Sequence, residues 1–144
     1  MNKIRRFEEK DVRQIIKIGK SVKEFKVSDT SVFWPEKLLE RWLKSSDDVM
    51  LVAENSDKII GFVFFAYHTP TTKAVLENIW VDSVNRKTGL AEELFNEGMN
   101  RLKNIGCTYV VGFVSEKNQV ARNFFINRGL IEKEKVIWID TLIK

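Results

Sequence analysis

Residues 73–91, KAVLENIWVDSVNRKTGLA, form the stretch around which the rest of the chain is organised. The segment from Ala74 to Val81 is rich in strand formers, and a short polar connection over 82–88 follows it. Gly89 then leads into the amphipathic run LAEELFNEGMNRL, which predicts a helix. A strand, a loop and a helix in this order place free N–H groups and a positive dipole end beside small residues. The stretch therefore predicts a cradle for a phosphate group.

Spacing separates this stretch from other phosphate-binding motifs. The chain lacks the Gly-x-x-x-x-Gly-Lys-Ser/Thr pattern of a P-loop and the Gly-x-Gly-x-x-Gly turn of a dinucleotide fold. It has instead Arg86-x-x-Gly89-x-Ala91, directly after a strand in the middle of the chain. Arg86 and Lys87 bring two cations to the loop, and the alternative for both is a solvated loop without a ligand.

Length and composition fit a single domain over residues 1–144 with an ordinary core. Apolar residues make up 44% of the chain and charged residues 31%, as in other globular proteins. No apolar run approaches the roughly 20 residues of a membrane span. The first residues, MNKIRRFEEKD, lack the apolar segment of a signal peptide. We therefore expect no membrane association and a cytoplasmic location.

The net charge and the number of possible metal ligands limit the classes of partner that we expect. The net charge of +4 suits a polyanionic small molecule, while the absence of a basic stripe with interleaved aromatic residues argues against nucleic acid. The single Cys107 excludes an internal disulfide and fits a reducing compartment. With one histidine, one cysteine and no ligand spacing, we expect no metal site.

Periodicity predicts an α/β (α+β) fold with a mixed, mostly antiparallel sheet flanked by helices. Strands are expected at 2–7, 49–53, 59–67, 74–81, 108–114 and 135–143, with one more short strand near Leu130. Helices are expected from Glu8 to Val22, from Pro35 to Leu43, from Gly89 to Gly106 and from Asn118 to Gly129. The strand–helix–strand unit at 74–114 should be a parallel, right-handed crossover, and the other strands should pair antiparallel.

The loop motif resembles the acetyl-CoA signature of the GNAT superfamily of N-acetyltransferases, Gln/Arg-x-x-Gly-x-Gly/Ala. A second segment, NQVARNFFINRGL at 118–130, is similar to that superfamily's Asn-x-x-Ala-x-x-Phe-Tyr-x-x-x-Gly-Phe segment. The residues that match are Asn118, Ala121, Phe124 and Gly129. Phe125 replaces the usual Tyr, and Leu130 replaces the usual Phe. The two motifs have the expected separation, and the order of elements is similar from end to end.

The resemblance implies acetyl-CoA as cofactor and a GNAT-like fold with a splayed pair of parallel strands at its site. In the superfamily, the pantetheine arm enters that gap and pairs with exposed backbone of the strand before the loop. The corresponding strand residues are Ile79, Trp80 and Val81. The pyrophosphate would be held by Arg86, Lys87, Thr88, Gly89, Leu90 and Ala91. Asn118 would lie near the arm, and a simple N-cap of the next helix is its alternative.

The catalytic groups are less clearly marked. Acetyl transfer to an amine needs a base for the amine and an acid for the departing thiolate. The resemblance implies a Tyr acid and, in the ribosomal-protein branch, a Glu base, but Phe125 and Phe113 occupy those two positions. Glu77, on the strand beside the cofactor gap, is the candidate base, and an exposed strand carboxylate is its alternative.

Other aromatic and polar residues have alternative interpretations. Tyr67 and His68 could reach the acceptor side or be ordinary loop residues, and Tyr109 is expected to pack in the core. Phe33 and Trp34, ahead of the second helix, either lie near a ligand or fasten that helix to the core.

Three functions are compatible with these observations. The first is an N-acetyltransferase that moves an acetyl group directly from acetyl-CoA to a primary amine of a small molecule or peptide. The second is a non-catalytic acyl-CoA-binding module or sensor of the same fold, which the two Phe replacements favour. The third is a structural domain whose phosphate loop has no ligand. The chain carries no motif that identifies the acceptor, and it leaves open the oligomeric state, including a homodimer.

Overall fold

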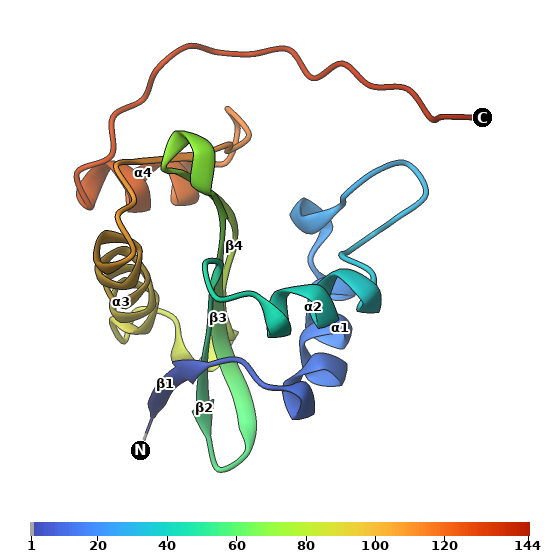
Figure 1. The fold of residues 1–144 in the computed structure, drawn as a ribbon. Coiled ribbons are helices and arrows are strands. Elements are labelled where there is room, and N and C mark those ends of the chain that lie inside the picture. Colours follow the sequence, from blue (N-terminus) through green and yellow to red (C-terminus); the bar gives the residue numbers. More distant parts are fainter. Residues whose placement is uncertain (1) are drawn as a thin grey trace. The chain divides into compact units, whose positions relative to one another are not determined.

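Three antiparallel strands from the middle of the chain form the centre of the sheet (Figure 1). The computed structural model describes residues 2–144. Its strands are β1 (Lys3–Arg6), β2 (Val49–Asn55), β3 (Lys58–His68), β4 (Lys73–Val81) and β5 (Tyr109–Gly112). They lie in the order β1-β2-β3-β4-β5, with β4 and β5 parallel and the other neighbours antiparallel. The mixed, mostly antiparallel sheet predicted from the sequence is therefore confirmed.

Four α-helices accompany the sheet strands in the described residues 2–144. They are α1 (Val12–Ser21), α2 (Glu36–Lys44), α3 (Leu90–Asn104) and α4 (Gln119–Asn127). Short 3-10 turns lie at Glu9–Asp11, Lys23–Phe25, Thr69–Thr71 and Ser83–Asn85. Gly106 and Gly129, with φ of 92° and 87°, follow α3 and α4 in the left-handed conformation that commonly ends helices, as predicted.

The chain divides into two compact units, and the division falls between Val111 and Gly112. The first unit holds β1 to β4, α1 to α3 and nearly all of β5, whereas the second holds α4 and the residues after it. Within the first unit, α1 and α2 cover one face of the sheet and α3 covers the other (Figure 1). A single N-acetyltransferase domain over 1–144 stays a prediction.

The central strand β3 is buried on both faces, which explains its uninterrupted apolar sequence. Phe62 and Phe64 point toward α1 and α2, where they join a cluster that includes Trp42. Phe65 points the other way, and its ring contacts Phe95 of α3 with 6.2 Å between centroids. Because alternate residues of a strand face opposite sides, this one strand supports both helical layers.

The end of the chain differs from the prediction. The sequence predicts a strand at 135–143 and another near Leu130, but the described residues 130–144 form none. Among the described residues, no backbone N–H of 131–144 donates to a backbone carbonyl. A strand exists only when a neighbour pairs with its backbone, so an apolar alternation without a neighbour remains extended chain. The prediction that Tyr109 packs in the core is also wrong, because this residue is 54% exposed on β5.

Candidate active site

The loop that follows β4 is braced by its own side chains. Asp82 accepts hydrogen bonds through Oδ1 from the backbone N–H of Asn85 at 3.0 Å and from its side-chain amide at 2.6 Å. The Asp82 N–H donates to the Ile60 carbonyl on β3 at 2.9 Å, which ties the loop to the sheet. The Thr88 hydroxyl donates to the Asn85 carbonyl at 2.5 Å. These bonds hold the backbone that leads into α3 in one conformation.

Gly89 stands where this loop becomes α3. Its φ of 89° is left-handed, and a Cβ at this position would meet no heavy atom within 4 Å. None of the backbone N–H groups of residues 86–91 has a hydrogen-bond acceptor among the described residues. Open space and free N–H groups thus coincide at the positive end of a 15-residue helix. This arrangement is suited to binding an anion.

The cations of the loop lie at its surface. Arg86 is exposed, and its Nε donates to the Val81 carbonyl at 3.2 Å, so the guanidinium is held at the end of β4. Lys87 is also exposed and takes a left-handed φ of 64°. Leu90 is buried and fastens the first turn of α3 to the core, and Ala91 beside it is partly buried. Residues 86–89 of the predicted phosphate-binding stretch are therefore exposed, whereas the Leu90 side chain belongs to the core.

The end of β4 carries the three residues predicted to face the pantetheine arm. Ile79, Trp80 and Val81 pair with Val63, Phe62 and Gly61 of β3. The Trp80 ring also stacks on Phe62, with centroids 5.6 Å apart. These three residues are thus fixed from the β3 side, and their other edge lies on the side of β4 away from β3.

A bulge in β4 sets Glu77 apart from its neighbours. Phe64 of β3 pairs with Asn78 whereas Phe65 pairs with Leu76, so Glu77 has no partner residue on β3. Its carboxyl is partly buried and has no hydrogen-bond or ion-pair partner within the described part of the chain. Burial raises the pKa of Glu77 above its ordinary value. A carboxyl that loses water without gaining a partner is typical of a catalytic base rather than of a structural residue.

Sequence reasoning missed Asn78, the residue that follows Glu77. Asn78 is buried, and its Oδ1 accepts a hydrogen bond from Trp34 Nε1 at 2.6 Å. The indole N–H can only donate, so the amide oxygen must face Trp34 and the amide nitrogen must face away. Trp34 comes from the segment between α1 and α2, and its ring packs edge-on against Trp42. A polar residue inside an apolar strand was the signal that could have indicated this bond.

Residues near the end of β3 form hydrogen bonds with side chains close to them. Asp48 Oδ1 accepts from the backbone N–H of Tyr67 at 2.7 Å, and His68 Nδ1 lies 2.7 Å from the Thr71 hydroxyl. Phe33 is buried, so the core interpretation holds for it. Of the residues considered from the sequence in the first unit, Glu77 is the one whose geometry favours proton transfer.

The predicted residues of the second unit are described separately. Asn118 caps α4, because its side-chain oxygen accepts from the Ala121 N–H at 3.1 Å, so the N-cap interpretation is met. Phe125 packs edge-on against Phe124, with centroids 5.2 Å apart. Phe113 is 74% exposed. Neither Phe side chain can donate or accept a proton.

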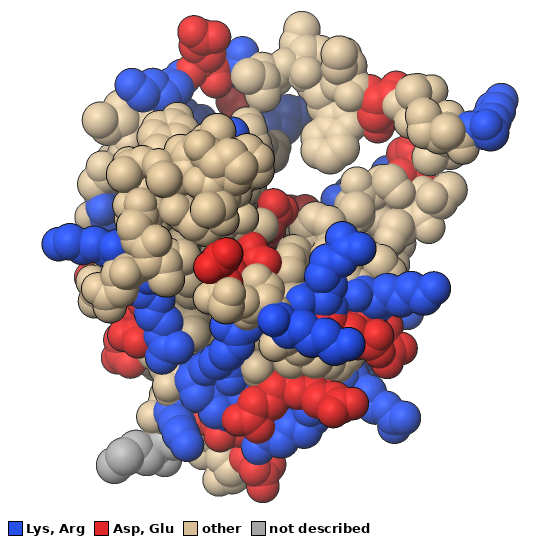
Figure 2. Space-filling model, viewed as in Figure 1, with Lys and Arg blue, Asp and Glu red and all other residues tan. Residues whose placement is uncertain are grey.

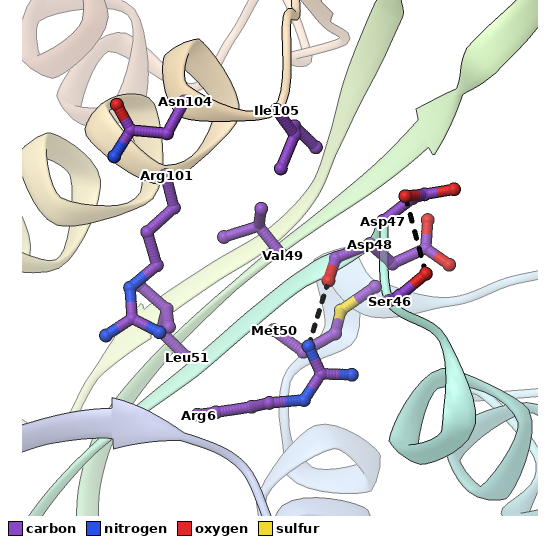
Figure 3. A pocket seen from close by; sticks show the side chains of 10 residues that line it. All are labelled: Arg6, Ser46, Asp47, Asp48, Val49, Met50, Leu51, Arg101, Asn104 and Ile105. Carbon is purple, nitrogen blue, oxygen red and sulfur yellow. Dashed lines mark hydrogen bonds between the residues drawn. The ribbon is translucent and has the colours of Figure 1, made fainter.

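A hollow of about 360 Å³ in the first unit lies between β2 and the end of α3 (Figure 3). It contains none of the predicted site residues, and its charges already have partners. Arg6 donates to the carbonyls at the end of α2, at 2.9 Å to Trp42 and at a shorter distance to Ser45. Arg101 pairs with Glu97 at 2.9 Å. The hollow is therefore not the candidate site.

Comparisons with known proteins identify the family. A model of the acetyltransferase (GNAT) family matches residues 19–130, which is most of the chain. The chain therefore belongs to the GNAT acetyltransferase family, whose members are acetyl-CoA-dependent acyltransferases. A search of curated protein sequences finds no match.

Solved structures support the fold. An aminoglycoside N-acetyltransferase AAC(6')-Iy in complex with CoA is 19% identical, with a TM-score of 0.79 over 98% of this chain and 100% of that one. An aminoglycoside acetyltransferase from an uncultured soil metagenomic sample, in complex with sisomicin, is 19% identical, with a TM-score of 0.79 over 99% and 97%. The ribosomal-protein-S18-alanine N-acetyltransferase from Escherichia coli is 21% identical, with a TM-score of 0.75 over 93% and 80%.

The residues present fit the family's cofactor, acetyl-CoA. Its pyrophosphate needs several donors and close approach to the backbone, which the free N–H groups of 86–91 and the open side of Gly89 provide. Its amide-containing arm needs backbone groups to pair with, and the end of β4 has an edge that faces away from β3. Among the described residues, no helix is long and apolar enough to cross a membrane.

Proposed function

We propose that the protein transfers the acetyl group of acetyl-CoA directly to a primary amine of a small molecule or peptide. The observation that carries the proposal is the partly buried, unpartnered Glu77 carboxyl on the bulge of β4, the strand that leads into the phosphate loop. The names of the solved relatives specify N-acetylation of aminoglycosides and of a ribosomal-protein alanine, which supports an amine as the acceptor.

The proposed roles of the cofactor residues follow from their backbone. Acetyl-CoA, when bound, supplies the acetyl thioester. The N–H groups of 86–91 hold its pyrophosphate, and Arg86 and Lys87 add positive charge beside it. The backbone of Ile79, Trp80 and Val81 pairs with the amides of the pantetheine arm. For Asn118, in the second unit, a cofactor role stays what the family resemblance implies.

Glu77 is proposed to prepare the acceptor. Its carboxylate takes a proton from the ammonium form of the amine, directly or through one water, because only the neutral amine is a nucleophile. Its raised pKa makes it a stronger base than an ordinary Glu. The amine nitrogen then bonds to the acetyl carbon and gives a second proton to water, while the carbon–sulfur bond breaks and its electron pair stays on sulfur. Phe125 cannot donate a proton, so we expect water to protonate the thiolate.

Two glycines offer a matched test of the cofactor site. Gly89 and Gly106 both have left-handed φ, and a Cβ would meet no heavy atom within 4 Å at either position. Gly89→Glu and Gly106→Glu therefore carry the same conformational cost, but only the first places a carboxylate where phosphate should bind. We expect calorimetry to show loss of CoA binding for Gly89→Glu and near wild-type affinity for Gly106→Glu. Equal affinities for CoA in the two variants would contradict the assignment of the phosphate site to Gly89.

The acceptor is tested by thiol release from acetyl-CoA across a panel of amines. The panel should include aminoglycosides, polyamines and peptides with a free α-amine or lysine. We expect at least one primary amine to accelerate release in the wild-type protein. Tight CoA binding without release by any amine would instead favour the acyl-CoA-binding module that Phe125 and Phe113 make a second candidate.

A further inference from the structure

Asn78 is a buried side chain with one unused hydrogen-bond donor. Its Oδ1 accepts from the Trp34 indole at 2.6 Å, so the amide nitrogen Nδ2 is the end that points away from that ring. Nδ2 forms no hydrogen bond with any described residue. Asn78 is 4% exposed, and Nδ2 lies within the small part of it that touches open space. The side chain therefore presents one oriented N–H donor that a ligand can satisfy.

The pairing of β4 with β3 sets the face of the sheet on which this donor lies. Asn78 pairs with Phe64, and Trp80 pairs with Phe62. Residues that pair directly across two antiparallel strands share a face, and Phe62 and Phe64 belong to the cluster under α1 and α2. Trp34, which holds the amide oxygen, comes from the segment between these two helices. The donor is therefore on the α1–α2 side of the sheet and not on the α3 side.

The bulge in β4 changes the usual relation between Glu77 and Asn78. Leu76 pairs with Phe65, which faces α3, whereas Asn78 pairs with Phe64, which faces the other way. Regular alternation would put Leu76 and Asn78 on the same face, because they are two positions apart. One of the two steps between them therefore leaves the face unchanged, so Glu77 shares a face with one of its neighbours. A carboxyl is better accommodated beside Asn78, because that face already carries a polar group that reaches open space.

Positive charge covers the helices on this side of the sheet. Together α1 and α2 carry six exposed cationic side chains and two exposed acidic ones, both of them on α2. The cations are Arg13, Lys17, Lys20, Lys37, Arg41 and Lys44. In Figure 2, Lys and Arg side chains gather over these helices. This excess of positive charge opposes the approach of a ligand that carries several positive charges.

We propose that Asn78 selects the acceptor, because its Nδ2 donates a hydrogen bond to an oxygen that the acceptor carries beside its amine. The inference rests on the proposed acetyl transfer with Glu77 as base, and it names the substrate class. An N–H donor recognises a carbonyl or hydroxyl oxygen and disfavours an ammonium group, which has no lone pair. The α-amine of an amino acid or peptide has its carbonyl one carbon away, whereas polyamines and lysine side chains have no such oxygen. The acceptor is therefore an α-amine and not a polyamine.

Three small amines of equal length test the proposal. Ethanolamine, propylamine and ethylenediamine differ only in the group beyond the amine, which is a hydroxyl, a methyl or an ammonium group. Thiol release from acetyl-CoA gives kcat/KM for each. We expect ethanolamine to exceed the other two by about 10- to 100-fold, the factor that corresponds to leaving one buried donor without a partner. A peptide with a free α-amine and no lysine should likewise exceed a blocked peptide with one lysine.

Two variants separate the donor from the indole bond. Asn78→Val removes both the donor and the bond to Trp34, whereas Trp34→Phe removes that bond and leaves the donor. We expect Asn78→Val to bring the three values of kcat/KM close together and Trp34→Phe to retain most of the preference. Asn78→Asp keeps an acceptor for the indole and replaces the donor by an oxygen, so its preference should move toward ethylenediamine. Asn55→Val, at an exposed strand residue, is the matched control and should keep the wild-type ratios.

Ratios between amines within one variant do not depend on how much of the protein is folded, so the outcomes are distinct. Equal use of the three amines by the wild type, or ratios that Asn78→Val leaves unchanged, would overturn selection by Asn78 and leave acetyl transfer standing. A loss of preference in Trp34→Phe as large as in Asn78→Val would also overturn it, because the amide nitrogen is still present there. Thiol release with no amine at all would overturn the proposed function and, with it, this inference.

Discussion

Asp11 and Glu77 are both carboxylates that folding removes from water, and they differ in what replaces the water. Asp11 is 1% exposed and receives hydrogen bonds from Arg5 at 2.7 and 2.9 Å and from the Glu8 N–H at 2.7 Å. Glu77 is partly buried and receives none from the described residues. A fully paired buried carboxylate holds elements together, whereas an unpaired one costs stability. The contrast sets a structural carboxylate, Asp11, apart from Glu77, whose proposed role is that of a base.

The surroundings of Asp11 explain what a structural carboxylate does. Arg5 lies between Asp11 and Glu54, and it also gives Glu54 two bonds at 3.0 and 2.9 Å. These bonds raise the pKa of Arg5 and hold the pKa of Glu54 below its ordinary value. The network joins β1 to β2 and to the turn before α1. Its charged groups are all paired with one another, so none is free to act on a substrate.

Glu77→Gln should have the largest effect, and it should fall on turnover. If Glu77 is the base, removing its charge should lower turnover by roughly 10²–10⁴-fold, the usual contribution of a general base. Thiol release measured with a saturating amine and acetyl-CoA provides the number. Glu9→Gln makes the same change at an exposed glutamate and should keep wild-type turnover. Wild-type turnover in Glu77→Gln as well would return Glu77 to the exposed-carboxylate interpretation.

The same substitution should leave a signature in pH dependence. Activity of the wild-type protein should fall as pH drops through the raised pKa of Glu77, at a pH above the ordinary value of about 4.3. The free energy of unfolding should depend on pH in the opposite direction and should be higher at low pH. Because the folded protein holds this proton more tightly than the unfolded chain, the free energy of unfolding declines as pH rises from the unfolded to the folded pKa. Denaturant titrations should show that decline in the wild type and its loss in Glu77→Gln, making the variant slightly more stable at neutral pH.

Asp11→Asn should show the opposite behaviour, a loss of stability with unchanged turnover per folded molecule. Breaking a buried ion pair costs about 3–5 kcal/mol, and we expect the lower end because Glu54 still neutralises Arg5. Urea titrations of the unfolding free energy measure this loss. Asp29→Asn is the control, because its ion pair with Lys26 is exposed and such pairs contribute roughly 0–1 kcal/mol. Equal losses in the two variants would show that burial does not distinguish these pairs.

The sequence predicted the parts of this molecule that depend on backbone and local pattern. The apolar strand at 59–67, the helix that begins after Gly89 and its end at Gly106 each follow from a local pattern that needs no knowledge of neighbours. The phosphate loop belongs to this group, because free N–H groups at a helix start result from any strand–loop–helix sequence.

The remaining parts depend on contacts between distant residues. The bulge that isolates Glu77 arises from the register between β3 and β4, and nothing in residues 73–81 alone marks it. The bond between Trp34 and Asn78 joins residues 44 positions apart in sequence. The strand predicted at 135–143 has the correct composition, but a strand also needs a partner, which composition does not supply. These are the points at which local reasoning gave alternatives or was wrong.

The smallest predicted effect concerns the support beside Glu77. Trp34→Phe keeps an aromatic ring against Trp42 and removes the N–H that Asn78 accepts at 2.6 Å. Because Asn78 is 4% exposed, water replaces the lost donor poorly, and we expect a loss of about 1–2 kcal/mol in unfolding free energy. In the double-mutant cycle with Asn78→Val, which removes the acceptor, the two losses should not add, because both remove the same bond. Unlike Glu77→Gln, this variant should keep turnover within a few-fold of wild type, since the proton-accepting group is untouched. Additive losses would mean that Trp34 stabilises the segment through packing alone, and a loss of turnover as large as that of Glu77→Gln would mean that the position of the bulge, rather than the carboxylate itself, limits the reaction.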